Sequence, residues 1–337
     1  YYIEVHGNLV MDGTDVISPS HGIEISTNDD VEITDCTISS PGENGIAISS
    51  TTGTVNINWT NVTSSERAGI NVSGASDDVH ILGGTFSQGD TGVWIAGSKV
   101  TLDQVNITSN DAYGLKVGSS TSWVDVWHAS FTANTAGINT SNALLNVTAC
   151  TFIGGTTGIE AEQSTVNILG CDILPVTTAI ETSSSTVHVL NSNVTVSMTG
   201  VSSHQDEINI TNSILKDLTD VGSISHPTDL RMNTVTVSGC AQPLDLSNVQ
   251  SGQLSYLNAI DNVAALRVDN STFTISDSIF INQTSYGLMA ETSDLDIIRT
   301  TFEDNEEGAN CSDPTDVMSC KDSAFRRNLI GISVAGG

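Results

Sequence analysis

Basic residues are scarce in this chain: 10 lysines and arginines stand against 39 aspartates and glutamates, which gives a formal net charge of −29. Nucleic acids and anionic membrane surfaces are bound through clustered lysines and arginines, so we expect neither as a partner. Long apolar runs are absent as well. Because the sequence has no stretch of 18 consecutive apolar residues, we expect no membrane span in this chain.

Helical periodicity and familiar catalytic motifs are also missing. No stretch of a dozen residues shows an apolar period of 3.6, so helices should be few and short. The sequence has no recognisable Ser-His-Asp arrangement, zinc-binding histidine pair or phosphate-binding loop. His128, with Asp125 and Trp127 close by in sequence, is interpreted most simply as a turn residue held by a hydrogen bond. We therefore predict no catalytic residue from motifs, and whether the chain is an enzyme stays open, with the non-enzymatic interpretation favoured.

What the chain does contain is a repeat. A tetrad of glycine, an aliphatic residue, any residue and a second aliphatic residue returns every 21 to 24 residues. Its clearest copies are Gly22–Ile25, Gly45–Ile48, Gly69–Val72, Gly92–Ile95 and Gly114–Val117, and weaker copies continue to Gly331–Val334. A fixed period of this length is typical of stacked repeats, in which each unit buries its apolar face against the next one. The chain should therefore be a solenoid.

Two further series, offset from the tetrad, indicate the kind of solenoid. One alternates apolar and polar residues, as in Val31–Ile33 and Val55–Ile57, and the other is a single apolar position such as Ile38 or Val62. Period-two alternation predicts strands with one buried face. Three short strands per coil predict an all-β parallel β-helix of about 15 coils, a single domain over residues 1–337.

This architecture makes a specific prediction: Ile46, Ile70 and Val93 are successive members of one inward column. Leucine-rich repeats fit less well because their leucine and asparagine consensus is absent, and left-handed hexapeptide helices need a strict six-residue rhythm. The chain starts at Tyr1 and stops at Gly337, just after a new repeat begins. We therefore expect an excerpt of a longer surface protein or a unit that assembles end to end.

The pattern Val31–Ile38 followed by Gly45–Ile48 resembles that of right-handed parallel β-helix proteins of the pectate-lyase-like superfamily, especially their non-enzymatic cell-surface members in archaea and bacteria. The resemblance covers nearly the whole chain and is weakest from Val201 to Ala264. It implies the fold, but lyases, hydrolases, epimerases, adhesins and surface-layer proteins share that scaffold. The polysaccharide lyases of the superfamily use arginine or lysine against a uronate, whereas the basic residues here are scattered.

In a β-helix, residues at the same position of successive coils become neighbours. The outward row of the tetrad therefore places Trp94 beside Lys116, a candidate platform for stacking a sugar. It also places Glu160 one coil from Glu181, a candidate carboxylate pair of a glycosidase. Since an acidic surface of stacked coils also produces such pairs by chance, these four residues are predicted only as a carbohydrate-binding row.

Asparagines in Asn-X-Ser/Thr sequons are a further candidate set. They are Asn58, Asn61, Asn71, Asn106, Asn139, Asn146, Asn193, Asn209, Asn270, Asn282 and Asn310. Several fall at outward positions of the strands, where a glycan could be attached, so we predict N-glycosylation of an extracellular protein. The alternative is that these asparagines form hydrogen-bonded ladders on strand surfaces and at coil corners.

Cysteines and acidic clusters give weaker signals. Cys311 and Cys320 are nine residues apart in a polar stretch and could form a disulfide in an oxidising compartment. Cys36, Cys150 and Cys171 share one inward position and are predicted to be buried small hydrophobic residues. The clusters Asp29–Asp30, Asp77–Asp78 and Glu303–Glu307 leave calcium open as a ligand. None has the spacing of a calcium loop, so we predict no metal site and no other cofactor.

These features favour a secreted or cell-surface structural or adhesive protein, a stiff, acidic and glycosylated β-helical rod that serves as a spacer or assembly component, as in an archaeal envelope. Its expected partners are copies of itself, other envelope proteins and glycans. The alternative is a carbohydrate-active enzyme, such as a polysaccharide lyase, hydrolase or epimerase, or a carbohydrate-binding module. A viral or phage fibre is a third alternative, which would require trimerisation.

Overall fold

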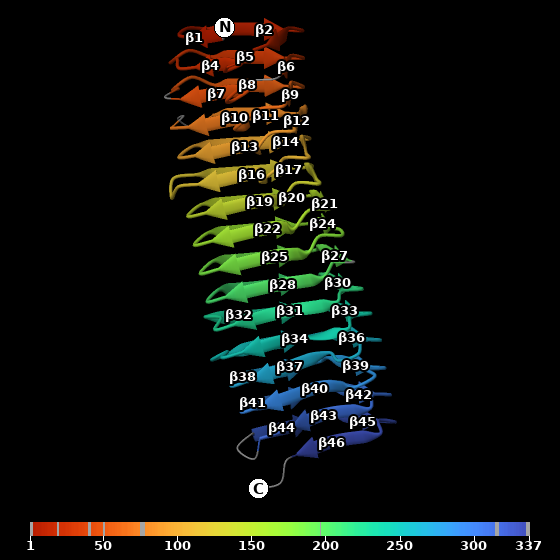
Figure 1. Ribbon diagram of the computed structural model, residues 1–337. Coiled ribbons are helices and arrows are strands. Elements are labelled where there is room, and N and C mark those ends of the chain that lie inside the picture. Colours follow the sequence, from red (N-terminus) through yellow and green to blue (C-terminus); the bar gives the residue numbers. More distant parts are fainter. Residues whose placement is uncertain are drawn as a thin grey trace. The chain divides into compact units, whose positions relative to one another are not determined.

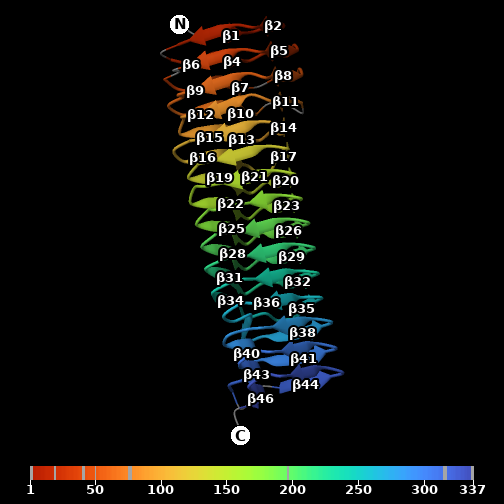
Figure 2. The ribbon, with the colours of Figure 1, turned by 90° about the vertical axis from the view of Figure 1, so that its right-hand side faces the viewer.

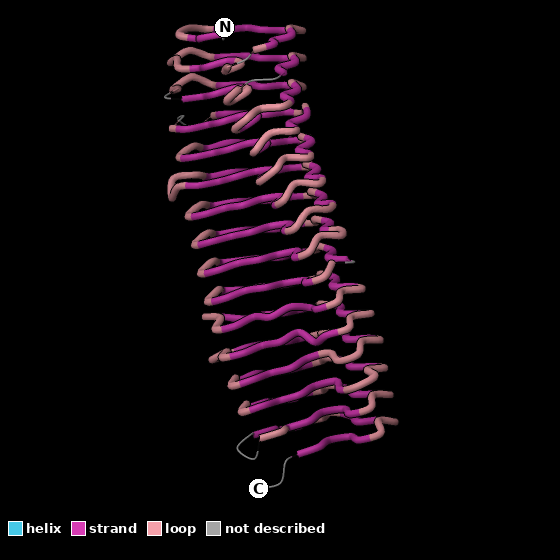
Figure 3. The backbone as a smooth tube through the Cα atoms, viewed as in Figure 1, coloured by secondary structure: helices cyan, strands magenta, loops and turns pink. Residues whose placement is uncertain are grey.

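The computed structural model describes residues 3–18, 20–39, 42–49, 51–74, 78–195, 197–313 and 317–334. All regular secondary structure in these ranges is β-strand, and the strands are labelled β1 to β46 (Figure 1). Short loops join the strands, as the alternation of magenta and pink shows (Figure 3). Within the same ranges we find no helix with the length and apolar character needed to cross a membrane. Residue contacts divide the chain into a first unit, Tyr1–Cys171, and a second unit, Asp172–Gly337.

The first unit consists of three sheets, A, B and C, in which all pairs of neighbouring strands are parallel. Sheet A contains β1 (Ile3–Val5), β4 (Ile23–Ile25), β7 (Ile46–Ser49), β10 (Ala68–Ser73), β13 (Thr91–Ala96), β16 (Tyr113–Gly118), β19 (Ala136–Ser141) and β22 (Thr157–Glu162). Sheet B contains β2 (Leu9–Asp12), β5 (Val31–Thr34), β8 (Val55–Asn58), β11 (Val79–Leu82), β14 (Lys99–Asp103), β17 (Trp123–Trp127), β20 (Leu144–Thr148) and β23 (Thr165–Leu169). Sheet C contains β3 (Asp15–Ile17), β6 (Thr37–Ser39), β9 (Asn61–Thr63), β12 (Thr85–Ser87), β15 (Asn106–Thr108), β18 (Ser130–Thr132) and β21 (Thr151–Ile153).

The second unit repeats this plan with its own parallel strands. Its sheet A strands are β25 (Thr178–Ser183), β28 (Thr199–His204), β31 (Asp220–Ser225), β34 (Gln242–Ser247), β37 (Leu266–Asp269), β40 (Tyr286–Glu291), β43 (Glu307–Cys311) and β46 (Ile330–Val334). Its sheet B strands are β26 (Thr186–Leu190), β29 (Glu207–Thr211), β32 (Asp229–Asn233), β35 (Gly252–Ser255), β38 (Thr272–Ser276), β41 (Asp294–Ile298) and β44 (Val317–Lys321). Its sheet C strands are β24 (Asp172–Ile173), β27 (Asn193–Thr195), β30 (Ile214–Lys216), β33 (Thr236–Ser238), β36 (Asn258–Ile260), β39 (Ile279–Ile281), β42 (Thr301–Glu303) and β45 (Ala324–Arg326).

The chain is therefore a right-handed parallel β-helix with three strands per coil, and the predicted fold class is confirmed. The predicted inward column of Ile46, Ile70 and Val93 is also confirmed. Ile70 pairs in register with Ile46 on one side and with Val93 on the other, and all three side chains are fully buried. Inward phenylalanines also stack in columns, with the ring centroids of Phe131 and Phe152 4.9 Å apart. The prediction of one domain over the whole chain stays a prediction.

The repeated glycine of the tetrad has a steric cause. A Cβ atom on Gly69 would lie 2.6 Å from the carbonyl oxygen of Gly92, and one on Gly92 would lie 2.6 Å from that of Gly114. Both contacts are closer than atoms tolerate, and backbone on the neighbouring coil has little room to move. Glycine therefore recurs because successive coils approach each other through their backbones at this position.

Strands of sheet B are followed directly by residues with left-handed backbone, such as Asp35 (φ 52°), Trp59 (φ 50°) and His128 (φ 51°). These residues lie where the chain turns from sheet B into sheet C. The repeat is hardest to recognise in the sequence at β31, where glycine follows the buried Val221 instead of preceding an aliphatic residue, and Gly222 has a φ of 135°.

Candidate functional site

The residues of the row predicted on sheet A are aligned in the first unit as far as Glu160, while carbohydrate binding by them stays a prediction. Trp94 (β13), Lys116 (β16), Asn139 (β19) and Glu160 (β22) are successive register partners, and we call these four residues the sheet A row. Alternation within each strand turns them outward, because their neighbours in sequence, such as Val93 and Ile95, are fully buried. Trp94 keeps 37% of its surface exposed.

Lys116 lies close to two aromatic rings. Its Nζ atom is 5.3 Å from the centroid of Trp94 and 4.9 Å from that of Tyr113, at the start of the same strand. Both distances lie in the range of cation–π attraction, which orders the lysine and the rings together. Tyr113 is an addition that the row read from the sequence did not include.

Glu160 is held by Asn139, whose Nδ2 atom donates a hydrogen bond of 2.7 Å to Oε2 of the glutamate. Glu181 lies in β25 of the second unit. The proposed carboxylate pair of Glu160 and Glu181 therefore stays a prediction. Together the rings, the ammonium group and the amide–carboxylate pair of the sheet A row offer stacking surface and hydrogen-bonding groups, the combination that sugars require.

His128, which follows β17 of sheet B, is bonded to a residue from another coil. His128 bonds through Nδ1 to Oδ1 of Asp103, at 3.0 Å, and not to Asp125, its neighbour in sequence. Asp103 is in the preceding coil, so its proximity is set by coil stacking. The interpretation of His128 as a turn residue held by a hydrogen bond agrees with its left-handed φ of 51°.

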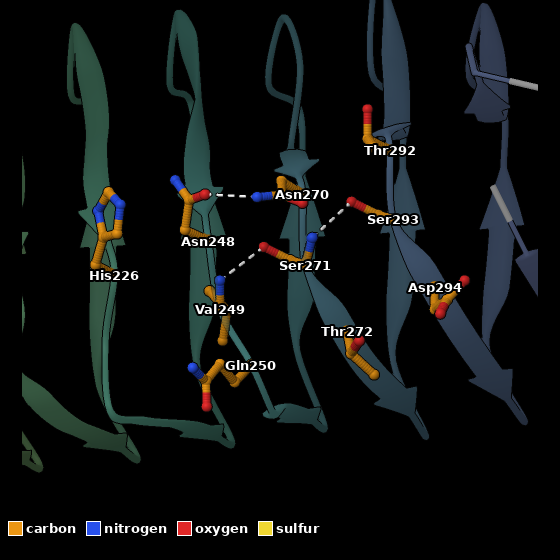
Figure 4. Close-up of a pocket in the computed structure, with 10 residues that line it drawn as sticks. All are labelled: His226, Asn248, Val249, Gln250, Asn270, Ser271, Thr272, Thr292, Ser293 and Asp294. Atoms are coloured by element: carbon orange, nitrogen blue, oxygen red, sulfur yellow. Dashed lines mark hydrogen bonds between the residues drawn. The ribbon is translucent and has the colours of Figure 1, made fainter. Parts of the chain in front are cut away.

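A polar groove of about 680 Å³ lies in the second unit (Figure 4). It is lined from successive coils by His226, Asn248, Asn270 and Thr292. Nδ2 of Asn270 donates a hydrogen bond of 2.7 Å to Oδ1 of Asn248. Below them, the Ser271 hydroxyl accepts a hydrogen bond of 2.9 Å from the backbone nitrogen of Val249. Several of the groove's polar groups thus bond to one another, which stabilises the corner of the coil.

A second feature of this unit is what we call the acid–arginine cluster, Asp245, Arg267 and Glu291. Asp245 and Arg267 are register partners in β34 and β37, and Nη2 of Arg267 lies 2.9 Å from Oε2 of Glu291. They border a small cavity of about 150 Å³, lined by Ser223, Asp245, Leu246, Ser247, Arg267 and Asp269. Oδ1 of Asp245 and Nε of Arg267 are both buried and accept or donate no hydrogen bond within the protein.

Burial raises the pKa of Asp245 above its ordinary value, and the nearby Arg267 offsets part of that rise. Burial, followed by the charge of Asp245, likewise raises the pKa of Tyr286. A carboxyl group that holds its proton to a higher pH than usual, next to a neutral phenol, can donate a proton to a leaving group. Motif searching could not find this cluster because its members come from three coils.

The predicted glycosylation asparagines are all at least partly accessible. Asn106, Asn270 and Asn282 are exposed, and the other eight are half-buried on strand surfaces. Several amides already donate hydrogen bonds, for example Nδ2 of Asn146 to Oδ1 of Asp125 at 2.7 Å and Nδ2 of Asn193 to Oδ1 of Asp172 at 2.8 Å. The ladder interpretation therefore has direct support at these positions, and glycosylation stays a prediction.

The cysteines differ in their surroundings. Cys36, Cys150 and Cys171 are buried as predicted, and the sulfur of Cys171 accepts a hydrogen bond of 3.5 Å from the backbone nitrogen of Cys150. The side-chain interaction with Cys171, followed by burial, holds the pKa of the Cys150 thiol far above its ordinary value, so this thiol stays protonated. Cys311 is buried in β43 of sheet A, and Cys320 is exposed in β44 of sheet B. Their disulfide stays a prediction.

The acidic clusters considered for calcium are used in other contacts. Oδ1 of Asp30 accepts from the backbone nitrogen of Thr54 at 2.9 Å, and Asp304 is bound by Arg327 through two hydrogen bonds of 2.7 Å. Asp77 lies outside the described residues. In the part of the chain that the structure describes, no three His, Cys, Asp or Glu side chains gather as a metal site would need. Calcium binding stays a prediction without a structural candidate.

Comparison with known proteins supports the fold. A family model described as "Periplasmic copper-binding protein (NosD)" matches residues 1–143. The periplasmic alginate epimerase AlgG is similar to this chain in its crystal structure, with 12% identity, 86% of this chain and 76% of that chain covered, and a TM-score of 0.51. A point mutant of AlgG gives 11% identity, the same coverage and a TM-score of 0.54. No curated protein matches the sequence.

The copper in the family description can be tested against the matched residues. Residues 1–143 contain one cysteine, Cys36, and one methionine, Met11, whereas copper favours clustered sulfur and imidazole ligands. Cys36 is fully buried, and its thiol donates 3.1 Å to the carbonyl oxygen of Thr34. The histidines of this stretch do not gather with cysteine or carboxylate side chains into a group of three among the described residues. The described residues therefore do not fit a copper site, and the function proposed below does not depend on copper.

Proposed function

We propose that this protein is an extracytoplasmic structural and adhesive β-helix protein that binds glycans through outward rows of its coils. An extracytoplasmic location is supported by the periplasmic description of the NosD family model and of AlgG. The inward columns of each unit supply a stable stack, and the outward positions are free to vary without disturbing it. The expected partners are cell-surface glycans, other envelope proteins and further copies of the chain.

The observation that carries the proposal is the proximity of the Lys116 ammonium to the rings of Trp94 and Tyr113, at 5.3 Å and 4.9 Å from their centroids. A partly exposed tryptophan fixed by a cation gives a sugar ring a flat apolar surface, and Asn139 and Glu160 in the next two strands supply hydrogen-bonding groups. Such a site needs no chemistry to be useful, since adhesion requires binding only.

The test is affinity electrophoresis of the protein in gels with neutral or acidic polysaccharides, with and without calcium. We expect retention by at least one polysaccharide and about tenfold weaker binding by Trp94→Ala, since an aromatic contact contributes on the order of 1 kcal/mol. Trp59→Ala is the matched control, because Trp59 is also exposed but lies at a corner of the coil away from the row. Unchanged binding by Trp94→Ala would contradict the proposal, as would failure of every polysaccharide to retain the protein.

The acid–arginine cluster favours a second candidate function, a carbohydrate-active enzyme. Its support is the raised pKa of Asp245 beside Tyr286 and Arg267, on the outward side of sheet A. Incubation with the same polysaccharides, followed by mass spectrometry of the released sugars, tests it. Loss of turnover in Asp245→Asn, with turnover retained in Glu160→Gln, would support an active site at the cluster. Absence of turnover in the unmodified protein would remove this candidate.

A further inference from the structure

One strand of the first unit presents two tryptophans to solvent on the same side. In β17, Trp123 and Trp127 are 47% and 41% exposed, and Asp125 lies between them, whereas Val124 and Val126 are fully buried. Alternation along the strand forces the three outward side chains onto one face. We call Trp123, Asp125 and Trp127 the β17 strip. It belongs to sheet B, so it is separate from the sheet A row.

The strip is held in place by its own hydrogen bonds. Nε1 of Trp123 donates a hydrogen bond of 3.1 Å to Oδ1 of Asp125. Nδ2 of Asn146, in β20, donates a second hydrogen bond of 2.7 Å to the same oxygen. Asn146 in turn accepts 2.8 Å from Nδ2 of Asn167 in β23. These strands follow one another in the sheet (Figure 2). A ring fixed in this way loses little conformational entropy when a ligand stacks on it.

Charged groups lie close to both rings. Nζ of Lys99, in β14, lies 5.9 Å from the ring centroid of Trp123, and Asp103, the register partner of Trp127, is bound by His128 at 3.0 Å. The charged groups at the strip thus include one lysine, Lys99, and two aspartates, Asp103 and Asp125. On a chain with a net charge of −29, this arrangement disfavours a polyanionic ligand. The rings and the amide and carboxylate groups between them suit a ligand with apolar faces and hydroxyl edges.

We propose that the β17 strip binds a neutral polysaccharide chain lying along the strand, with one sugar stacked on Trp123, another on Trp127, and hydroxyl groups between them bonded to Asp125 and Asn146. The two tryptophans are four residue steps apart along an extended strand, a distance of about 13 Å. One sugar cannot span that distance, so the strip selects oligosaccharides over monosaccharides. The proposal rests on the glycan-binding function above but names a second site, on another sheet and with other residues.

The experiment starts with affinity electrophoresis of the whole chain in gels with hydroxyethylcellulose, galactomannan, xylan or laminarin, and with polygalacturonate as the charged comparison. Oligosaccharides of two to six sugars from the retained polysaccharide are then titrated by calorimetry. The variants are Trp123→Ala, Trp127→Ala and the conservative Trp123→Phe. Trp59→Ala is the exposed-tryptophan control, Trp94→Ala reports on the sheet A row, and equal melting temperatures establish that the variants are folded.

We expect a neutral polysaccharide to retain the protein, with an affinity that rises with oligosaccharide length. Trp123→Ala and Trp127→Ala should each weaken binding of the longest oligosaccharide about tenfold and remove the length dependence. Trp123→Phe keeps an aromatic face but loses the hydrogen bond to Asp125, so it should weaken binding less than Trp123→Ala, and Trp59→Ala should stay close to the unmodified protein. If only Trp94→Ala weakens binding, the strip is wrong and the sheet A row stands. If only the β17 variants weaken it, the strip stands and the sheet A row is wrong. Retention by polygalacturonate alone, or by nothing, overturns the strip.

Discussion

A Cβ atom on Gly114 would lie 2.5 Å from the carbonyl oxygen of Gly137 and 2.9 Å from Cδ1 of Phe131. Gly114→Ala should therefore push two coils of the first unit apart and lower the free energy of unfolding by at least about 2 kcal/mol. Urea denaturation followed by circular dichroism measures this. Gly118→Ala, at the end of the same strand, is the control, since its Cβ would meet nothing nearer than Oγ of Ser141 at 3.8 Å. Equal stability of the two variants would refute the steric explanation.

Buried amides form a second structural column whose loss should be measurable. Oδ1 of Asn134 accepts a hydrogen bond of 3.0 Å from the backbone nitrogen of Asn110. Nδ2 of Asn134 donates a hydrogen bond of 2.9 Å to the carbonyl oxygen of Ile107. Asn134→Ala leaves buried groups without partners, so we expect a loss of about 2 to 3 kcal/mol in urea denaturation. The exposed Asn106→Ala should change stability little. A loss no larger than that of Asn106→Ala would contradict this role.

Two ion pairs of the second unit predict a pH dependence. Arg299 holds the pKa of Asp277 below its ordinary value, and Arg327 does the same for Asp304. A carboxyl group with a lower pKa in the folded state stabilises that state above its unfolded pKa of about 3.9, and the contribution is lost as the pH falls through the folded pKa.

Arg299→Met should therefore melt at a lower temperature than the unmodified protein at pH 7, and the difference should disappear on acidification below both pKa values of Asp277. High salt should also reduce the difference, because both partners are at the surface. Thermal melting across pH is the measurement. A difference that stays constant into acid would show that Arg299 acts through packing instead of charge.

Asparagine accessibility predicts unequal glycosylation. Asn106 is exposed in β15, whereas Asn146 is half-buried and its Nδ2 donates 2.7 Å to Oδ1 of Asp125. A glycan on Asn146 would break that hydrogen bond, so in the native protein we expect occupancy at Asn106 and little at Asn146. Glycopeptide mass spectrometry of protein from its natural source gives both occupancies. Equal occupancy would contradict the prediction, and a bare protein would remove the glycosylated interpretation of the sequons.

The fold could be predicted because each coil repeats two simple signals, period-two alternation and a glycine where backbones approach. Ile46, Ile70 and Val93 lie in one column for that reason. The same stacking rule placed Trp94, Lys116 and Glu160 in one row. Tyr113 was missed because a row read from equivalent positions leaves out a neighbour in the same strand that reaches the lysine diagonally.

Other contacts depend on side-chain conformation, which a repeat pattern does not encode. Asp206 is an example: it is fully buried at a coil corner, where it accepts hydrogen bonds from the Thr182 hydroxyl at 2.7 Å and from the backbone nitrogen of His204 at 2.9 Å. In the sequence it resembles any surface aspartate. The acid–arginine cluster and the partner of His128 could not be predicted from the sequence for the same reason, since each contact joins residues more than 20 positions apart.

All four tryptophans of the chain, Trp59, Trp94, Trp123 and Trp127, lie in the first unit, and each is at least 37% exposed. Intrinsic tryptophan fluorescence therefore reports on the first unit only. Quenching or emission shifts will report ligand contact and melting in residues 1–171, while residues 172–337 stay optically silent when excitation is selective for indole. Comparing that signal with circular dichroism, which follows both halves, would reveal whether they unfold in one transition or two.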